Sequence, residues 1–325
     1  MRRGQILQQK GQGLRCEVTS RSIAILSGGS HMRRSAVILQ FEYWLALAIS
    51  ARQGSRMRTR QHSTRRVYFL AAALLLPCWQ SSAHEFWLDP VQYTPKAGAS
   101  VPIVFRIGLN FQGDTYPFVR SLSRRFTVTD RQGERAIKTL DGDDPAAELK
   151  FASSGLSVLV HERVQEQVVF PTFAKFEESL TIEGLEPIIE KHQSAGKPMA
   201  NIRELYSRCA KSLINVGKGG GDDKLVGMPL ELVSEKNPYQ LAGATELPVR
   251  LYAQGKPISG VLVKSFNRDD PMSPLLARTD REGRVMVDVS RAGEYLVSAV
   301  QMVEPKSGDD ADWVSFWASL TFAKP

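Results

Sequence analysis

The sequence is poor in cysteine, in histidine and in long apolar runs. Of its 325 residues only three are cysteines, Cys16, Cys78 and Cys209, and only five are histidines. So few thiols exclude a small domain held together by a disulfide framework. The apolar run Val67–Trp79 is too short to cross a membrane as a helix, which takes about 20 residues.

Familiar catalytic and ion-binding signatures are also missing. No Gly-x-Ser-x-Gly elbow is present, so the sequence gives no support to a hydrolase of that class. Lys218–Gly221 is rich in glycine but lacks the spacing of a phosphate-binding loop, and we interpret it as a linker. The clustered aspartates, such as those at 141–144 and 309–312, lack EF-hand spacing, so turn formation explains them better than calcium binding.

The first recognisable feature of the chain is a segment that resembles a secretory signal peptide, although it lies far from the first methionine. Four arginines within residues 58–66 precede the apolar run, and Ser81, Ser82 and Ala83 supply the small residues that signal peptidase reads. We therefore expect residues 57–83 to be a signal peptide cleaved near Ala83. Residues 1–56 are then an upstream extension outside the expressed protein. The alternative is a true extension with an inner-membrane anchor around residues 36–51.

The charge of the chain depends on this leader. The chain has 42 Lys and Arg against 34 Asp and Glu, but residues 1–83 hold 13 and 2 of these, so residues 84–325 carry a net charge of −3. The high isoelectric point thus belongs to the leader, and nucleic-acid binding loses its support. The sequence predicts a periplasmic protein without stable membrane insertion after cleavage.

The remaining chain reads as mainly β, with three parts. Short apolar runs separated by turn residues predict an N-terminal β module over residues 84–170 and a C-terminal β-sandwich module over residues 229–325. Between them, residues 171–228 predict a helical insert followed by the Gly-rich linker. We expect two immunoglobulin- or transthyretin-like β-sandwich modules on either side of the insert.

Two local patterns refine this picture. Within the insert, helices are predicted over residues 173–180, 184–194 and 201–216, the last because apolar residues recur at three- and four-residue spacing. In the C-terminal module, Thr279–Arg284 carries the chemistry of a hairpin turn: Asp280 accepts from backbone N–H groups, and Gly283 supplies a positive φ.

Several segments spread over residues 84–325 together resemble an uncharacterised bacterial periplasmic family, a domain of unknown function formerly labelled NikM-like nickel-uptake proteins. The matching segments, in chain order, are His84–Leu88, Leu205–Lys211, Gly227–Val233, Asn237–Tyr239, Gly255–Pro257, Thr279–Gly283 and Asp312–Phe322. The resemblance implies a β-sandwich protein of the periplasm associated with metal uptake. It also implies a role for a histidine at the mature N-terminus, and only His84 matches that role.

His84 is the first candidate ligand for a metal ion. Cleavage after Ala83 would place a free α-amine and an imidazole on one residue, a chelate suited to Cu(II) or Ni(II). Such a site would weaken at acid pH, because the amine must be neutral to bind. The alternative is that His84 is merely a frayed polar terminus.

His161 and His192 are the weaker candidates for a second ligand. His161 follows an apolar run at the end of a predicted strand, where a polar residue is often simply exposed, and His192 is predicted on a charged, solvated helix face. Trp87, Trp313 and Trp317 could line a ligand groove, but core packing explains them better.

The sequence therefore favours an exported metal-binding or metal-delivery accessory protein, with copper or nickel as the ion and an inner-membrane metal transporter as the partner. The alternative is a metal-free module of the cell envelope that recognises a small molecule, a glycan or a protein. A third hypothesis, copper redox chemistry at His84, would require a second histidine ligand.

Overall fold

The computed structural model describes residues 84–241 and 243–325, so the expected upstream extension and the expected signal peptide lie outside the described residues. The expected class is confirmed: strands β1 to β17 dominate, and α2 and α3 are the two α-helices. Two short 3₁₀ helices, η1 (Arg120–Leu122) and η2 (Pro238–Gln240), lie in connections. Throughout these residues, no helix has the length and apolar character needed to cross a membrane.

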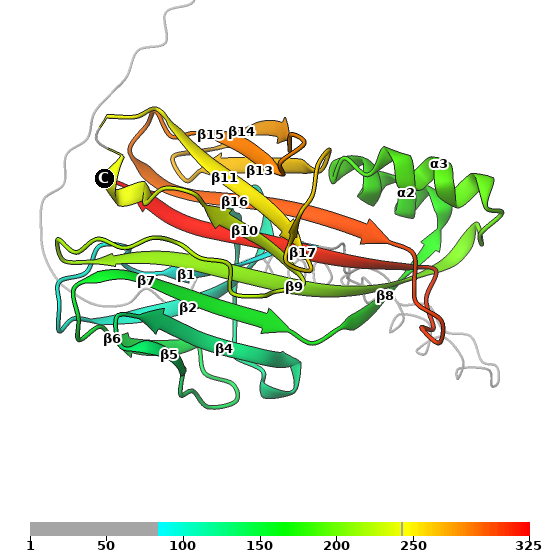
Figure 1. Ribbon diagram of the computed structural model, residues 1–325. Coiled ribbons are helices and arrows are strands. Elements are labelled where there is room, and N and C mark those ends of the chain that lie inside the picture. The colour runs from blue at the N-terminus through cyan, green and yellow to red at the C-terminus, as the bar shows by residue number, and fades with distance from the viewer. Residues whose placement is uncertain (1–83, 242) are drawn as a thin grey trace, which may run out of the picture. The chain divides into compact units, whose positions relative to one another are not determined.

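The largest element is a central sheet of nine strands to which both predicted modules contribute. Its strands are β4 (Ser123–Asp130), β5 (Gly133–Ala136), β7 (Gly155–Arg163), β8 (Glu166–Thr172), β9 (Ala200–Val216), β13 (Leu262–Asn267), β14 (Asp270–Arg278), β16 (Gly293–Val303) and β17 (Trp313–Lys324). The long strands β9 and β17 pair in parallel and join the two halves of the sheet (Figure 1). The N-terminal and C-terminal parts of the chain are therefore continuous through one set of backbone hydrogen bonds.

Two four-stranded sheets flank the central sheet. The N-terminal sheet consists of β1 (Glu85–Pro90), β2 (Ser100–Leu109), β3 (Gln112–Tyr116) and β6 (Ala147–Lys150). The C-terminal sheet consists of β10 (Leu230–Ser234), β11 (Glu246–Ala253), β12 (Lys256–Pro257) and β15 (Arg284–Asp288). Strand β1 was not anticipated from the sequence, and all six of its residues are buried.

The two flanking sheets pack on opposite faces of the central sheet. Alternate residues of a strand point to opposite faces. In β9, Cys209 and Leu213 lie in the core beneath the C-terminal sheet, whereas Ala210 and Ile214 lie in the core beneath the N-terminal sheet. The centre of the molecule is thus a sheet that is buried on both sides.

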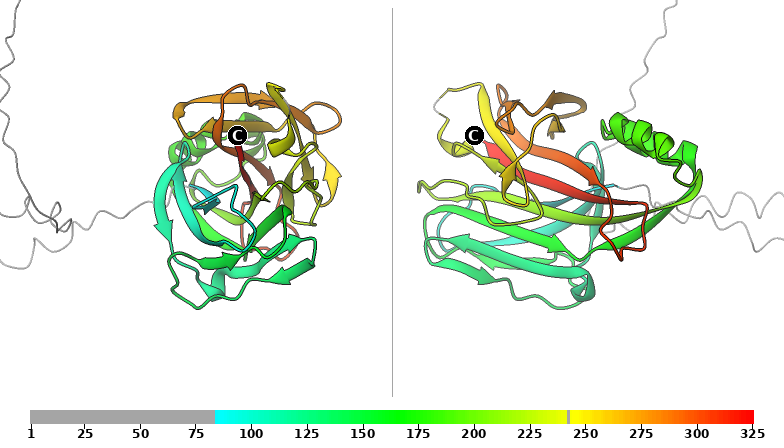
Figure 2. Two further views of the ribbon diagram at one scale, coloured as in Figure 1. Left: turned by 90° about the vertical axis from the view of Figure 1, so that its left-hand side faces the viewer. Right: turned by 45° about the vertical axis from the view of Figure 1, so that its right-hand side comes forward.

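Helices α2 (Phe173–Ile182) and α3 (Glu186–Ser194) confirm the first two predicted helices of the insert. The Thr172 hydroxyl accepts a hydrogen bond from the Lys175 backbone N–H and so caps α2. The pair lies at one end of the long strands (Figure 2). It packs against Ile202 and Trp313 on the face of the central sheet that the N-terminal sheet also covers.

The third predicted helix, over residues 201–216, is wrong. These residues form strand β9, 17 residues long and buried along most of its length. Because both faces of β9 are covered, apolar residues do not alternate with polar ones along it, and the remaining pattern resembled helical spacing. Leu205–Lys211, which we had taken as helical, is therefore part of a strand.

The turn at Thr279–Arg284 forms with the expected hydrogen bonds and positive φ. The two strands that it joins do not pair with each other, so it is not a hairpin. The Asp280 carboxylate accepts hydrogen bonds from the Glu282 and Arg284 backbone N–H groups, and Gly283 has φ +76°. However, β14 pairs with β13 in the central sheet, whereas β15 pairs with β11 in the C-terminal sheet. The turn therefore carries the chain from one layer to the next.

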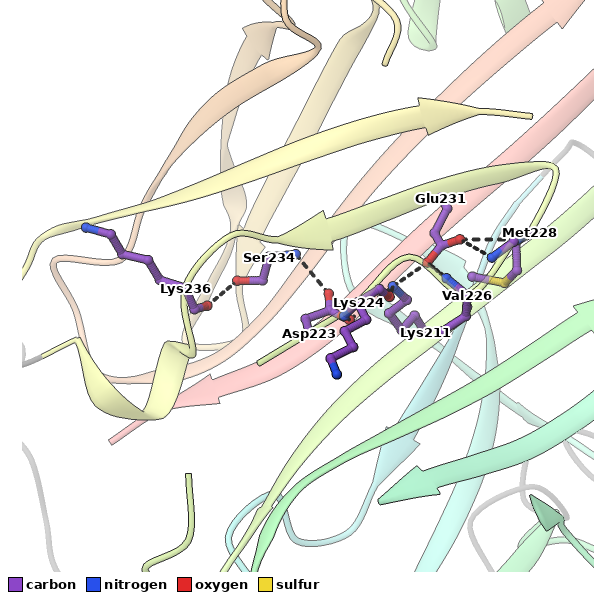
Figure 3. Close-up of polar contacts among 9 residues, drawn as sticks. Lys211, Asp223, Lys224, Val226, Met228, Glu231, Ser234 and Lys236 are labelled. Carbon is purple, nitrogen blue, oxygen red and sulfur yellow. Dashed lines mark hydrogen bonds and ion pairs between the residues drawn. The ribbon is translucent and has the colours of Figure 1, made fainter. Parts of the chain in front are cut away.

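A buried ion cluster fixes the loop that follows β9. The Lys211 ammonium is fully buried and donates to Glu231 Oε1 at 2.6 Å and to Asp223 Oδ1 at 3.1 Å (Figure 3). It also donates to the Lys224 carbonyl, at 3.0 Å. The carboxylates in turn accept from backbone N–H groups, including those of Val226 and Ser234. The two carboxylates therefore share one ammonium, and each charged group is also hydrogen-bonded.

This cluster corrects our interpretation of the segment after β9 as a free linker. Asp223 lies at the end of the Gly-rich stretch and is 7% exposed. Its Oδ2 accepts a hydrogen bond from the Ser234 backbone N–H in β10. The loop is held between the central and C-terminal sheets because its polar groups complete the Lys211 cluster.

Replacing Lys211 with Ala should lower the free energy of unfolding by about 3–5 kcal/mol, because two buried carboxylates would lose their cation. Urea denaturation at pH 7 measures this. The triple variant Lys211→Met, Asp223→Asn, Glu231→Gln should recover much of the loss, since no buried charge remains. Lys218→Ala, at an exposed position of the same loop, is the control. A loss below about 1 kcal/mol for Lys211→Ala would contradict the assignment.

Candidate functional site

A second group of buried charges lies on the opposite face of the central sheet, between β1 and the helix pair. We call it the polar strip. Its members come from five strands and the end of one helix: Glu85, Glu183, Glu204, Arg208, Lys264, Ser298, Ser315 and Ser319. It lies where the N-terminal sheet ends and the helical insert begins, so it is enclosed by parts of the chain that are far apart in sequence.

The strip begins at the first residue of β1. Glu85 Oε1 accepts a hydrogen bond from Ser298 Oγ at 2.8 Å and lies 3.3 Å from the Lys264 ammonium. Lys264 also donates to both carboxylate oxygens of Glu183, at 2.9 and 2.8 Å. Glu183 follows α2 as its C-cap, so Lys264 links β1 to the helix pair. Burial raises the pKa of Glu183, and Lys264 partly offsets this effect.

Glu204 lies in the middle of the strip and has no cation in direct contact. Ser315 Oγ donates a short hydrogen bond to its carboxylate, and the Trp317 indole N–H donates to the same Ser315 oxygen at 3.0 Å. Burial raises the pKa of Glu204 to about 7, although the Ser315 hydrogen bond and the charge of Arg208 oppose the rise. This carboxyl therefore takes up or releases a proton near neutral pH.

Arg208 forms the far end of the strip. It is 4% exposed, its guanidinium lies 4.7 Å from the centre of the Tyr206 ring, and its nearest carboxylate is Glu166 at 3.8 Å. Burial lowers the pKa of Arg208, with Arg163 contributing to the same effect. A buried guanidinium with a loosely held counter-charge is a ready partner for a carboxylate or another anion.

Buried polar atoms without a hydrogen-bond partner occur within the strip, at Glu85, Arg208 and Ser319, and on the surrounding face of the central sheet. Among the described residues, ten buried side-chain atoms lack a partner, and six of them belong to β1 or to the face of the central sheet that β1 covers. These six are Glu85 Oε2, Trp87 Nε1, His161 Nδ1, Arg208 Nε, Ser212 Oγ and Ser319 Oγ. Because an unpaired buried polar atom is costly, this concentration marks a place for water or a ligand.

His84 lies directly before β1 and is half-buried. The next residue, Glu85, is 3% exposed and belongs to the strip. The expected mature N-terminus would therefore start at the edge of the strip, held in place by a strand that is buried throughout. This differs from the frayed terminus that was the alternative for His84.

His161 lies inside the aromatic core between the N-terminal and central sheets. Its ring centre is 4.4 Å from that of Phe105 and 5.4 Å from those of Phe86 and Phe126. Nε2 is 3.2 Å from Ser123 Oγ. Burial, aided by Arg163, lowers the pKa of His161 to about 3, so the ring is neutral. The exposed strand end that the sequence favoured is wrong: His161 is 2% exposed.

His192 lies in a different aromatic cluster, beneath the helix pair. The expected solvated helix face is wrong, since its side chain is fully buried. Nδ1 accepts a hydrogen bond from the Trp313 indole N–H at 2.9 Å, and Nε2 lies 2.8 Å from the Pro198 carbonyl. Both ring nitrogens therefore have protein partners, and the ring closes the core between α3 and β17.

The other candidates from the sequence, the tryptophans and Cys209, lie buried in the core. Trp87 and Trp313 are fully buried and Trp317 nearly so, which confirms core packing. Cys209 lies on β9 and not on a helix, and burial raises the pKa of its thiol to about 12. Across residues 84–241 and 243–325, no group of three or more His, Cys, Asp or Glu side chains is placed to hold a metal ion.

Sequence reasoning missed most of the polar strip. Glu204 and Arg208 went unnoticed because β9 was taken for a helix, and Lys264 looked like an ordinary strand residue. One signal was available: His84–Leu88, Leu205–Lys211 and Asp312–Phe322, three of the segments that carried the family resemblance, meet at the strip. Their proximity could not be read from their positions along the chain.

Glu204→Gln should change how stability depends on pH. Because the pKa of Glu204 is raised on folding, the folded protein binds a proton that the unfolded chain has released between about pH 4.5 and 7, and stability falls as pH rises through this interval. The variant should be more stable than the wild type at pH 8, by on the order of 3 kcal/mol, and similar at pH 4. Urea denaturation across this range measures the difference.

The exposed Glu282→Gln serves as the matched control, and its stability profile should parallel that of the wild type. Parallel profiles for Glu204→Gln and the wild type would contradict a raised pKa at Glu204.

Comparison with known proteins identifies the family of this chain but assigns it no activity. No curated protein matches the chain. Similar solved structures include the D0-D1 domain of Intimin, with 12% identity and a TM-score of 0.17, covering 73% of this chain and 97% of that one. Another is a tetra-tandem repeat in the extending region of a large adhesion protein, with 14% identity and a TM-score of 0.19, covering 75% of this chain and 50% of that one. At such TM-scores, neither bears on fold or function.

The family model matches far more specifically than either structure. It covers residues 81–303, which includes β1, the helix pair, β9 and most of the polar strip. The chain belongs to the family described as Domain of unknown function (DUF4198).

Proposed function

We propose that this protein is an exported binding protein that holds a small polar ligand in the polar strip. The observation that carries the proposal is the concentration of six unpartnered buried polar atoms on β1 and the sheet face beneath it. In the C-terminal half of the same molecule, each charged group of the Lys211 cluster contacts an opposite charge. Within the strip, Glu85 Oε2, Arg208 Nε and Ser319 Oγ lack partners, as expected of groups that bind something else.

The chemistry of the strip favours a ligand with charged or strongly polar groups. Arg208 offers an unpaired N–H for an anionic or carbonyl oxygen, and Glu85 offers an unpaired carboxylate oxygen for a donor. Tyr206, Val300 and Trp317 form an apolar cluster beside them. A few polar groups beside an apolar wall are typical of small-molecule sites.

Export is part of the proposal. Its support is the signal-like sequence of residues 57–83, with cleavage near Ala83, and the position of His84 before a buried strand. Removal of the leader would expose a new N-terminus next to Glu85. The periplasm is the compartment that fits such a signal in a double-membraned bacterium.

Metal binding at His84 is the second candidate function. It is favoured by the anchoring of residue 84 to β1, whose six residues are all buried, because a fixed imidazole and α-amine chelate better than mobile ones. The described residues supply no complete set of ligands, so further donors would have to come from a bound molecule or a partner. On this view the protein, like the NikM-like proteins it resembles, would deliver copper or nickel to an inner-membrane transporter.

Arg208→Gln should abolish ligand retention. The full chain is exported, isolated from the periplasm without dialysis and weighed by native and denaturing mass spectrometry. The wild type should carry an additional small-molecule mass that Arg208→Gln lacks, because the variant cannot pair with an anionic group. Glu204→Gln, which preserves side-chain shape, should retain the fold and also weaken binding.

The control for this experiment is Arg135→Gln, on the edge strand β5, whose side chain forms an ion pair with Asp130 outside the strip. It should retain the ligand. The proposal would be contradicted if the wild-type mass equals that of the polypeptide alone and stays unchanged after incubation with the small-molecule fraction of the periplasm.

The metal candidate is tested with the same exported protein. Added Cu(II) or Ni(II) should bind at about one equivalent at pH 7.5, and binding should weaken at acid pH because the α-amine must be neutral to bind. His84→Ala and acetylation of the α-amine should each abolish binding. Binding that survives both changes would rule out His84 as the ligand.

A further inference from the structure

A hollow of about 410 Å³ lies at the edge of the C-terminal sheet, a size typical of small-molecule sites. Ten residues line it: Gln165, Ala253, Gln254, Gln301, Val303, Glu304, Lys306, Asp309, Val314 and Phe316. They come from the connection before β8, the turn between β11 and β12, the strands β16 and β17, and the loop between these two strands. None of them belongs to the polar strip.

The floor of the hollow is a part of the central sheet that the C-terminal sheet leaves uncovered. Gln301 pairs with Phe316 and Val303 pairs with Val314 across β16 and β17. The C-terminal sheet ends above them, because β11 turns back at Gln254, which has φ +49°. The Phe316 ring therefore stays half-exposed, although it packs against the same core as the neighbouring strands.

The floor faces away from the polar strip. In β17 the strip residues Ser315 and Ser319 have odd numbers, whereas Val314 and Phe316 have even ones. Successive side chains of a strand point to opposite faces, so the two sites lie on opposite sides of the central sheet. A ligand could occupy either site without touching the other.

The polar lining of the hollow comprises three amides, Gln165, Gln254 and Gln301, and three charged side chains, Glu304, Lys306 and Asp309. The side chains of Gln165, Gln254 and Gln301 make no hydrogen bond within the described residues. An amide both donates and accepts, as a hydroxyl does. The carboxylate of Glu304 is already paired with Lys191 at 3.1 Å and Lys197 at 3.0 Å. Asp309 Oδ2 accepts a hydrogen bond from the Lys306 backbone N–H, and the Lys306 side chain is exposed. The three amides are therefore the neutral hydrogen-bonding groups that the hollow offers, beside these charged ones.

We propose that this hollow binds one pyranose ring of a saccharide. A sugar ring presents hydroxyl groups around its rim, which match the three free amides, and an apolar C–H face, which matches Phe316 and the two valines of the floor. The site has room for a single ring and is open at one side, so the ring could be a free monosaccharide or the end of a longer glycan. This inference does not depend on the ligand of the polar strip.

The test is saturation-transfer difference NMR on the exported full chain, with D-glucose, D-galactose and N-acetylglucosamine as probes. At least one probe should bind, and Gln301→Leu should weaken that binding about tenfold, which corresponds to about 1.4 kcal/mol. Phe316→Ala should weaken it similarly. Gln132→Leu, at an exposed glutamine on the β4–β5 turn, should bind like the wild type.

Two further arms make the result decisive. Maltotriose and chitotriose are titrated beside the monosaccharides: tighter binding of the trisaccharides indicates a glycan end, and equal binding indicates a free sugar. Gln301→Leu, whose side chain keeps its approximate size, is checked for an unchanged melting temperature, so that lost binding reports the site. Absence of binding by all five saccharides, or binding that Gln301→Leu and Phe316→Ala leave unchanged, overturns the proposal.

Discussion

Burial of strand β9 on both faces is the constraint on which the rest of this structure depends. The strand pairs with β17 on one side and with β7 and β8 on the other, and it carries polar side chains into regions that water does not reach. Each such side chain must find its partner within the protein or from a bound molecule. The positions of the flanking sheets, the helix pair and the loop after β9 all supply such partners.

The two faces of β9 meet this constraint in different ways. Beneath the C-terminal sheet, Lys211 is surrounded by two carboxylates and a carbonyl, and the loop that brings Asp223 is fixed as a result. On the other face, Arg208 has a counter-charge only at 3.8 Å, and Glu204 has none in contact. The first arrangement is what a stable core requires. The second costs stability, and a ligand that completes the pairing would offset that cost.

The histidines show how packing decides whether a residue is available as a metal ligand or belongs to the core. His161 and His192 are attractive as metal ligands in a sequence with so few histidines. In the structure each is enclosed by phenylalanine or tryptophan rings, one between two sheets and the other beneath two helices. His84 differs because it precedes β1 at the edge of the polar strip. Of the three, it is the one whose position is compatible with a binding role.

The sequence by itself determined the mainly β class, the two helices of the insert, the turn at Asp280–Gly283 and the burial of the tryptophans. These follow from local propensity and from turn chemistry, which act over a few residues. Only the tertiary structure decided that residues 201–216 form a strand, because an element covered on both faces loses the alternation that would reveal it. It also decided the polar strip, whose residues run from Glu85 to Ser319 and meet only when the N-terminal sheet, the central sheet and the helix pair have packed together.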